Sequence, residues 1–151
     1  MPRNHFKDSV ADIVPPRKEC VVNPAQQKRI ESYLGIARDS GLPILAEGLL
    51  GTNVPAGGYY VKPTLIGDVS PDHRLAQEEI FGPVLVAIRF RGEADAIRIA
   101  NGTPYCLAAG IWTSDLGRSM RLACKIQSGQ VFVNNYGAGG GVELPFGGVK
   151  A

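Results

Sequence analysis

The chain has 151 residues, of which 44% are hydrophobic and 20% are charged, and a formal net charge of +2. This composition argues against a disordered chain, and no apolar run approaches the roughly 20 residues of a membrane span. The small net charge and dispersed Lys and Arg argue against nucleic-acid binding, and three cysteines and two isolated histidines indicate neither a disulfide framework nor a metal site. Residues 1–5 are not followed by the apolar stretch of a signal peptide, so we expect a cytoplasmic globular protein.

The first predicted element is a helix that starts at residue 23. Asn23 is expected to be its N-cap, Pro24 its first helical residue and Gln26 the partner that reaches back in a capping box. Gly41 ends the helix as a left-handed cap. The apolar face of this helix has helical spacing and consists of Ile30, Tyr33, Leu34 and Ala37.

Shorter elements follow the first helix. We expect a short strand at 43–46, a loop at 49–58, a strand at 59–66 that Pro63 interrupts or edges, and a short helix or turn at 71–77. The last of these would deliver the acidic pair Glu78 and Glu79 to the start of the next strand.

The second half predicts strands alternating with helices. Residues 84–88 are continuously apolar, as in a parallel strand covered on both faces, and further strands are expected at 107–112 and 130–134. Helices are expected at 93–100, closed by Asn101-Gly102, and after Ser114 or Asp115. Even spacing of the strand starts favours two successive right-handed crossovers. We therefore predict an α/β fold with a doubly wound, mostly parallel sheet.

The helix after residue 115 has two predicted faces. An apolar face would consist of Leu116, Met120, Ala123 and Ile126 or Gln127. A basic face would consist of Arg118, Arg121 and Lys125. Because charged side chains are rarely buried without a partner, we interpret the basic face as solvated.

Residues 78–84 read Glu-Glu-Ile-Phe-Gly-Pro-Val and set a carboxylate two positions before an aromatic ring. In an extended segment alternate side chains share one side, so Glu79 and Phe81 would point the same way. Glu79 would then accept hydrogen bonds from ribose hydroxyls while Phe81 lies against a nicotinamide. Gly82 and Pro83 predict a bend whose backbone can approach a ligand closely. The alternative is a solvated acidic pair beside a core phenylalanine.

Several motifs occur in a fixed order after this segment. They are Asn-Gly-Thr-Pro-Tyr at 101–105, Leu-Ala-Ala at 107–109, Val-Asn-Asn-Tyr at 133–136 and Leu-Pro-Phe-Gly-Gly at 144–148. With residues 78–84, this series resembles the C-terminal part of the catalytic region of NAD(P)-dependent aldehyde dehydrogenases. The resemblance covers residues 21–150. It implies that Glu79 holds the nicotinamide ribose, that Phe81 packs beside the nicotinamide and that Phe146 lies near the substrate pocket.

The resemblance also implies a division of the chain and an incomplete site. Residues 1–20 would be a poorly ordered or non-family N-terminal segment, and residues 21–151 a partial aldehyde dehydrogenase catalytic domain. The nucleophilic Cys, the general-base Glu, the oxyanion-stabilising Asn and the nucleotide-binding domain of the family lie upstream of the span that resembles this chain. We therefore expect a fragment with no catalytic residue of its own, whose cofactor in the intact enzyme is NAD or NADP and whose substrate is a small aldehyde.

None of the three cysteines is expected to replace the family nucleophile. Cys20 has Glu19 and Val21 as neighbours rather than a Gly-rich turn, and no adjacent base is indicated. Cys106 occupies a position where relatives usually carry Gly, and Cys124 falls on a helix. We expect both of these side chains to be small and buried or half-buried.

The Gly-rich stretch 136–141 does not open a helix and is not followed by Lys-Ser/Thr, so it does not predict a phosphate loop; by resemblance it is a flexible loop near the substrate entrance.

The chain itself would be an inactive piece of an oxidoreductase, a non-catalytic module that associates with itself as a homo-oligomer, or one half of a split enzyme that needs its upstream half. The aldehyde and the choice between NAD and NADP are not predicted.

Overall fold

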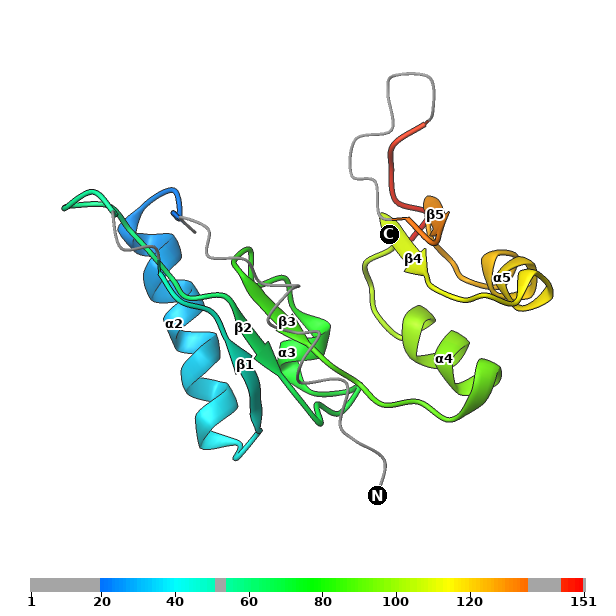
Figure 1. Cartoon of the computed structure of the whole chain (residues 1–151), viewed down its shortest axis with the longest axis horizontal. Coiled ribbons are helices and arrows are strands. Elements are labelled where there is room, and N and C mark those ends of the chain that lie inside the picture. The colour runs from blue at the N-terminus through cyan, green and yellow to red at the C-terminus, as the bar shows by residue number, and fades with distance from the viewer. Residues whose placement is uncertain (1–19, 51–53, 136–144, 151) are drawn as a thin grey trace. The chain divides into compact units, whose positions relative to one another are not determined.

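The structure is a computed structural model that describes residues 20–50, 54–135 and 145–150. The chain divides into two compact units, Met1–Arg89 and Phe90–Ala151. The first contains α2 (Pro24–Asp39), β1 (Ile44–Glu47), β2 (Thr64–Ile66), α3 (Arg74–Gln77) and β3 (Val84–Val86). The second contains α4 (Gly92–Asn101), β4 (Ala108–Ile111), α5 (Leu116–Ala123) and β5 (Gln130–Val133). Figure 1 labels these elements.

Local signals set both ends of α2. The Asn23 side chain accepts a hydrogen bond of 2.8 Å from the Gln26 backbone N–H, and Pro24 is the first helical residue, as predicted. After the helix, Gly41 has a φ of +66°, the left-handed conformation expected of a glycine cap. The predicted apolar face, Ile30, Tyr33, Leu34 and Ala37, is buried. The sequence therefore predicts this helix correctly.

The capping box is the one wrong prediction for α2. The Gln26 amide does not return to the Asn23 backbone. Its Nε2 donates instead to two carbonyl oxygens more than fifty residues away, those of Ile80 (3.1 Å) and Phe81 (2.6 Å). A tertiary contact has replaced the local one, because two backbone acceptors from another element lie within reach of the first turn.

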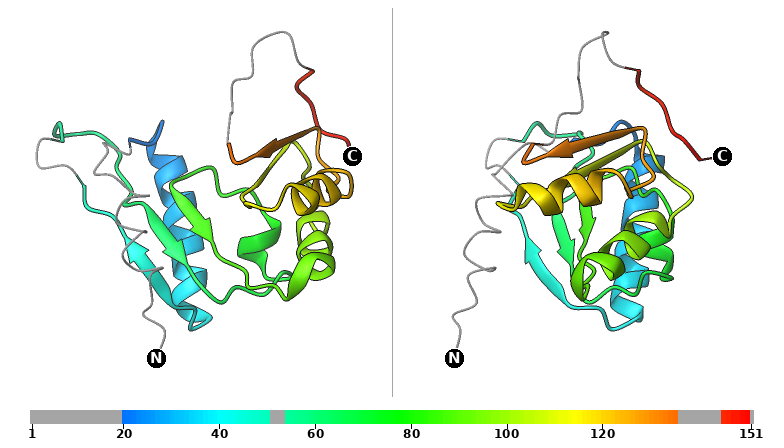
Figure 2. Two further views of the ribbon diagram at one scale, coloured as in Figure 1. Left: turned by 45° about the vertical axis from the view of Figure 1, so that its right-hand side comes forward. Right: turned by 90° about the vertical axis from the view of Figure 1, so that its right-hand side faces the viewer.

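The sheet of the first unit has the order β1-β2-β3, with β1 antiparallel and β3 parallel to β2. Helix α2 lies alongside this sheet (Figure 1; Figure 2). The strand predicted at 59–66 is shorter than expected. Only Thr64–Ile66 is a strand, after Pro63, which lacks the N–H that a ladder needs, and Tyr60 makes an isolated antiparallel bridge to Cys20.

The hydrophobic core of the first unit lies between α2, α3 and the sheet. Its buried members are Val21, Ile30, Tyr33, Leu34, Ala37, Val61, Ile66, Val69, Leu75 and Ile80. Strand β3 is parallel, as predicted, but Leu85 in its middle is 58% exposed. Within the described residues β3 is therefore covered on one face only, not on both.

Gly82 permits the close packing of α2 against the start of β3. A Cβ placed on Gly82 would lie 2.6 Å from Cγ1 of Ile30, a residue with no exposed surface. The close approach seen at this glycine is to the core of the first unit, and the predicted approach to a ligand stays a prediction.

In the second unit, β4 and β5 form a parallel pair with α5 between them, as predicted. Strand β3 pairs with β2 in the first unit, and the described part of β4 pairs with β5 in the second. The α/β class and the parallel pairing are confirmed.

Helix α5 begins as predicted, but it ends earlier and buries a different side than predicted. The Asp115 carboxylate accepts a hydrogen bond of 2.9 Å from the Arg118 N–H and caps the helix. The predicted apolar face is wrong at Leu116 and Met120, which are 76% and 58% exposed. The buried residue of α5 is Ser119, whose hydroxyl is satisfied by the Leu116 carbonyl at 2.7 Å.

An ion-pair cluster links α4 to α5. Glu93 of α4 accepts hydrogen bonds from Arg121 Nη2 (2.6 Å) and Arg118 Nε (3.2 Å). These bonds, led by that from Arg121, lower the pKa of the Glu93 carboxyl from 4.5 to about 2. The three basic residues of the predicted face are exposed, as predicted, and two of them, Arg118 and Arg121, also pair with Glu93 of α4.

Among the described residues, no helix is long and apolar enough to cross a membrane.

Replacing Gly82 by Ala should lower the free energy of unfolding of the first unit by about 1–3 kcal/mol, because the added methyl overpacks against Ile30. The control is Gly35→Ala in the interior of α2, where an added Cβ meets nothing within 4 Å. That control should raise stability by about 0.5–1 kcal/mol, since Gly is a poor helix residue. Urea unfolding followed by circular dichroism measures both, and a Gly82→Ala chain as stable as the wild type would contradict the packing.

The lowered pKa of Glu93 predicts a pH dependence of stability. The contribution of the ionised carboxylate is fully present above its ordinary pKa of 4.5 and is lost as the pH falls toward about 2. Glu93→Gln should therefore be less stable than the wild type at pH 7, and this difference should shrink below pH 4.5. Fluorescence of Trp112, the single tryptophan, reports unfolding of this unit. A difference that does not depend on pH would show that the ion pairs do not stabilise the fold.

Candidate cofactor-binding site

The two neighbouring carboxylates of the 78–84 segment have different surroundings. Glu78 accepts hydrogen bonds from Arg74 Nε (2.7 Å) and from the Tyr33 hydroxyl (2.5 Å). The bond from Arg74, and to a lesser extent that from Tyr33, lowers the pKa of Glu78. The bond to Glu78 raises the pKa of Tyr33. Glu78 is therefore held as an anion in a structural contact between α2 and α3.

Two guanidinium groups complete the surroundings of Tyr33. Arg29 and Arg74 lie over the ring at 5.3 and 5.4 Å from its centroid, within cation–π range. Arg29 Nη2 also donates to the Tyr33 hydroxyl oxygen (3.3 Å) and to the Glu79 carbonyl (2.7 Å). The backbone at Glu79 is thus tied to α2 while its side chain is not.

Glu79 and Phe81 are both exposed, and Ile80 between them is buried. Among the described residues, the Glu79 carboxylate has no hydrogen-bond or ion-pair partner, and the Phe81 ring is 68% exposed. The prediction assumed an extended backbone throughout, and this is wrong at Phe81, which has a φ of +55°. The segment turns at Phe81, yet a carboxylate and a ring remain on the surface two residues apart.

Phe146, the third predicted site residue, belongs to the second unit and is 62% exposed. The segment 145–150 that carries it is docked on the α4–β4 connection. Lys150 Nζ donates to the carbonyls of Asn101 (2.7 Å) and Thr103 (2.8 Å). The Cys106 sulfur accepts from the N–H groups of Val149 (2.9 Å) and Lys150 (2.6 Å). The predicted loop at 136–141 lies outside the described residues.

The three cysteines are all free thiols. Cys106 is buried, as predicted, and its sulfur has the packing role just described. Cys124 is exposed at the end of α5, so the expectation of a buried or half-buried thiol is wrong there. Cys20 is exposed and its thiol donates to the Val21 carbonyl at 3.5 Å. In the described part of the chain it has no hydrogen bond to a histidine or a carboxylate that could act as its base.

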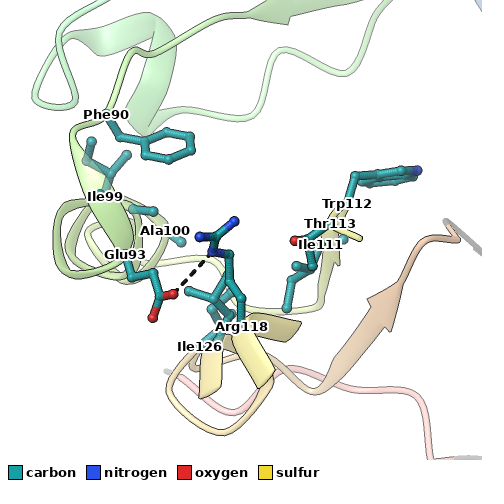
Figure 3. Close-up of a pocket in the computed structure, with 13 residues that line it drawn as sticks. Phe90, Glu93, Ile99, Ala100, Ile111, Trp112, Thr113, Arg118 and Ile126 are labelled. Carbon is teal, nitrogen blue, oxygen red and sulfur yellow. Dashed lines mark hydrogen bonds and ion pairs between the residues drawn. The ribbon is translucent and has the colours of Figure 1, made fainter. Parts of the chain in front are cut away.

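A cavity of about 640 Å³ lies within the second unit, between α4, β4 and α5. Its lining is mostly apolar and includes Phe90, Ile99, Ile111, Leu122 and Ile126. In Figure 3 the Arg118 side chain extends from α5 toward Glu93 on α4, with Phe90 and Trp112 on opposite sides. Glu93 and Arg118 in its wall are paired with each other, so the cavity presents mainly an apolar surface.

Two asparagines from the family-like motifs have structural roles that the sequence analysis did not assign. Asn134 exchanges two 2.9 Å hydrogen bonds with the backbone of Thr113 and so joins the ends of β4 and β5. Asn101 donates to the Lys125 carbonyl (2.9 Å) and accepts from the Gln127 N–H (2.8 Å), which secures the chain after α5. Asn101 is the last residue of α4 and Asn134 directly follows β5, so their places at the ends of elements were the available signal.

Comparison with known proteins places this geometry in a family. The family model described as "Aldehyde dehydrogenase family" matches residues 17–151. A betaine aldehyde dehydrogenase of Rhizobium johnstonii is 38% identical over 130 residues, covering 86% of this chain and 26% of that protein. The chain thus spans about a quarter of the length of this curated relative.

Solved structures agree with the sequence relatives. A crystal structure of a candidate aldehyde dehydrogenase from Burkholderia cenocepacia is 56% identical with a TM-score of 0.82, over 87% of this chain and 28% of that one. An aldehyde dehydrogenase from Bacillus cereus, solved as an NAD+ complex, is 36% identical with a TM-score of 0.77, over 87% of this chain and 26% of that one. The fold, the order of the motifs and these matches lead to one conclusion: the chain belongs to the aldehyde dehydrogenase family.

Proposed function

We propose that this chain supplies the nicotinamide-ribose part of a site that oxidises an aldehyde to a carboxylic acid with NAD+ or NADP+. The observation that carries the proposal is that the neighbouring carboxylates of Glu78 and Glu79 have different surroundings. The Glu78 carboxylate is hydrogen-bonded to Tyr33 and Arg74. The Glu79 carboxylate has no partner among the described residues and is exposed, as is the nearby Phe81 ring.

The exposed pair fits the group that the family implies. A carboxylate is an acceptor with two oxygens, so Glu79 suits the two vicinal hydroxyls of a ribose. The Phe81 ring offers a flat apolar surface for a nicotinamide. When bound, NAD(P)+ would supply the hydride acceptor for this oxidation. The residues of this chain bind and orient the cofactor and do not themselves react with the aldehyde.

We further propose that the 151 residues do not catalyse this oxidation alone. The family reaction needs a thiolate activated by a nearby base, and thiol nucleophiles act in such oriented constellations. In the described residues Cys106 is engaged with backbone N–H groups, and neither Cys20 nor Cys124 has a hydrogen-bonded base. The chain is thus a piece of an oxidoreductase site that needs a nucleophile from elsewhere.

The purified chain, incubated with NAD+ or NADP+ and a panel of aldehydes including betaine aldehyde, should give no reduced-nicotinamide absorbance above buffer. The reason is the missing activated thiolate. Turnover that is abolished by Cys20→Ala but kept in Cys124→Ala would contradict the proposal and identify Cys20 as the nucleophile.

A second function, a module that associates with itself or with an upstream half of the enzyme, has support from exposed apolar residues. Leu85, Leu116 and Met120 are exposed, and the cavity of the second unit is apolar. Sedimentation of the same preparation at several concentrations distinguishes an associating chain from a monomer. Restored turnover on mixing with an upstream half from a relative would favour the split enzyme.

A further inference from the structure

The cavity of the second unit combines an apolar lining with two aromatic side chains. Its volume of about 640 Å³ lies in the range of roughly 300–1,000 Å³ that is typical of pockets for small organic ligands. Phe90 and Trp112 lie on opposite sides of it (Figure 3), and they are 61% and 64% exposed. Exposed apolar side chains that gather at a hollow are typical of ligand-binding grooves. The cavity therefore suits a ligand with an aromatic or other apolar body.

Two charged side chains, Glu93 and Arg118, also line the cavity. The Glu93 carboxylate already accepts three hydrogen bonds. Arg121 binds both of its oxygens, from Nη2 at 2.6 Å and from Nε at 3.0 Å, and Arg118 Nε adds a bond of 3.2 Å. A cationic head group on a ligand would have to compete with two guanidinium groups for this carboxylate. Glu93 is therefore poorly suited to bind a ligand.

The guanidinium of Arg118 has donors to spare. An arginine side chain carries five N–H donors. In the described part of the chain, the Arg118 guanidinium donates one hydrogen bond, from Nε to Glu93. Its Nη2 lies 4.0 Å from Oδ2 of Asp115, which is longer than a hydrogen bond. The two terminal nitrogens can therefore donate the paired N–H···O bonds with which an arginine binds a carboxylate.

We propose that the cavity between α4, β4 and α5 binds small monocarboxylic acids with an aromatic body, whose carboxylate is held by Arg118. The apolar body would leave water for the apolar wall, and the carboxylate would use the donors that Glu93 leaves free. The lining residues all belong to the second unit. This inference therefore goes beyond the function proposed for Glu79 and Phe81 of the first unit and does not depend on it.

The experiment is a titration of the full chain followed by the fluorescence of Trp112. This residue is the single tryptophan and lines the cavity, so its emission reports occupancy. The probes are phenylbutyrate, phenylbutanol and phenylbutylamine, which share one apolar body and carry an anionic, a neutral and a cationic head group. Circular dichroism shows whether each variant is folded.

Two matched pairs of variants separate the effect of charge from that of volume. Arg118→Gln removes the proposed carboxylate ligand, and Arg121→Gln removes the other guanidinium on Glu93, which is not among the residues that line the cavity. Ala96→Phe fills the cavity from α4, whereas Ala94→Phe places the same ring at an exposed position of α4 outside the lining.

We expect phenylbutyrate to bind about tenfold more tightly than phenylbutanol or phenylbutylamine, because hydrogen bonds to charged groups contribute more than neutral ones. Arg118→Gln should reduce the affinity for phenylbutyrate to that for phenylbutanol, and Arg118→Lys should recover part of the loss. Arg121→Gln should bind phenylbutyrate nearly as the wild type does. Ala96→Phe should abolish binding of all three probes, and Ala94→Phe should not.

Equal affinities for the three probes, or undiminished binding of phenylbutyrate by Arg118→Gln, would overturn the inference. Binding that survives in Ala96→Phe would do the same, because the probe would then lie elsewhere. Trp112 emission that responds to none of the probes would also contradict it. Emission that changes with chain concentration when no probe is present, in step with sedimentation, would show that a second copy of the chain fills the cavity instead.

Discussion

The Glu78 carboxylate lies between the Tyr33 hydroxyl and the Arg74 guanidinium, and these two hydrogen bonds determine what its neighbour Glu79 can do. The contact of Glu78 with Tyr33 and Arg74 ties the end of α3 to α2. Because the Glu78 carboxylate is bound to these partners and Ile80 is buried, the residues on either side of Ile80 are directed outward. The exposed carboxylate and ring of the proposed cofactor site are consequences of this packing.

The two units of the chain differ in how completely they bury their apolar side chains. The first has a continuous core between one long helix and three strands. The second has few buried residues among those described, a cavity between its helices, and exposed Leu116 and Met120. In the second unit, side-chain hydrogen bonds to backbone from Asn101, Asn134 and Lys150 connect elements that apolar packing alone leaves open.

Local chemistry explains which parts of the fold could be predicted from the sequence. Asn23, Pro24 and Gly41 act within one turn of helix, so the bounds of α2 follow from their residue types. The direction of the Gln26 amide could not be predicted in this way, because its acceptors come from residues 80 and 81. The same holds for α5, where the buried side depends on where β4 and α4 lie, and Ser119 rather than Leu116 faces inward.

The candidate site shows the same limit. The spacing of Glu79 and Phe81 predicted two groups presented together, and both are exposed, but the left-handed backbone at Phe81 was not apparent from a non-glycine residue. The sequence assigned the ribose to Glu79, but it could not show what binds the neighbouring Glu78 carboxylate. Its partners, Tyr33 and Arg74, come from two different helices.

The most direct test of this account compares Glu78→Gln with Glu79→Gln in urea unfolding and in binding of β-nicotinamide mononucleotide. Glu78→Gln should lower the urea midpoint, because the amide cannot replace the ionised partner of Arg74. Glu79→Gln should change stability by less than about 0.5 kcal/mol, as surface substitutions do, but should abolish binding. Equal loss of stability in the two variants, or unchanged binding in Glu79→Gln, would contradict the division of roles between these neighbouring carboxylates.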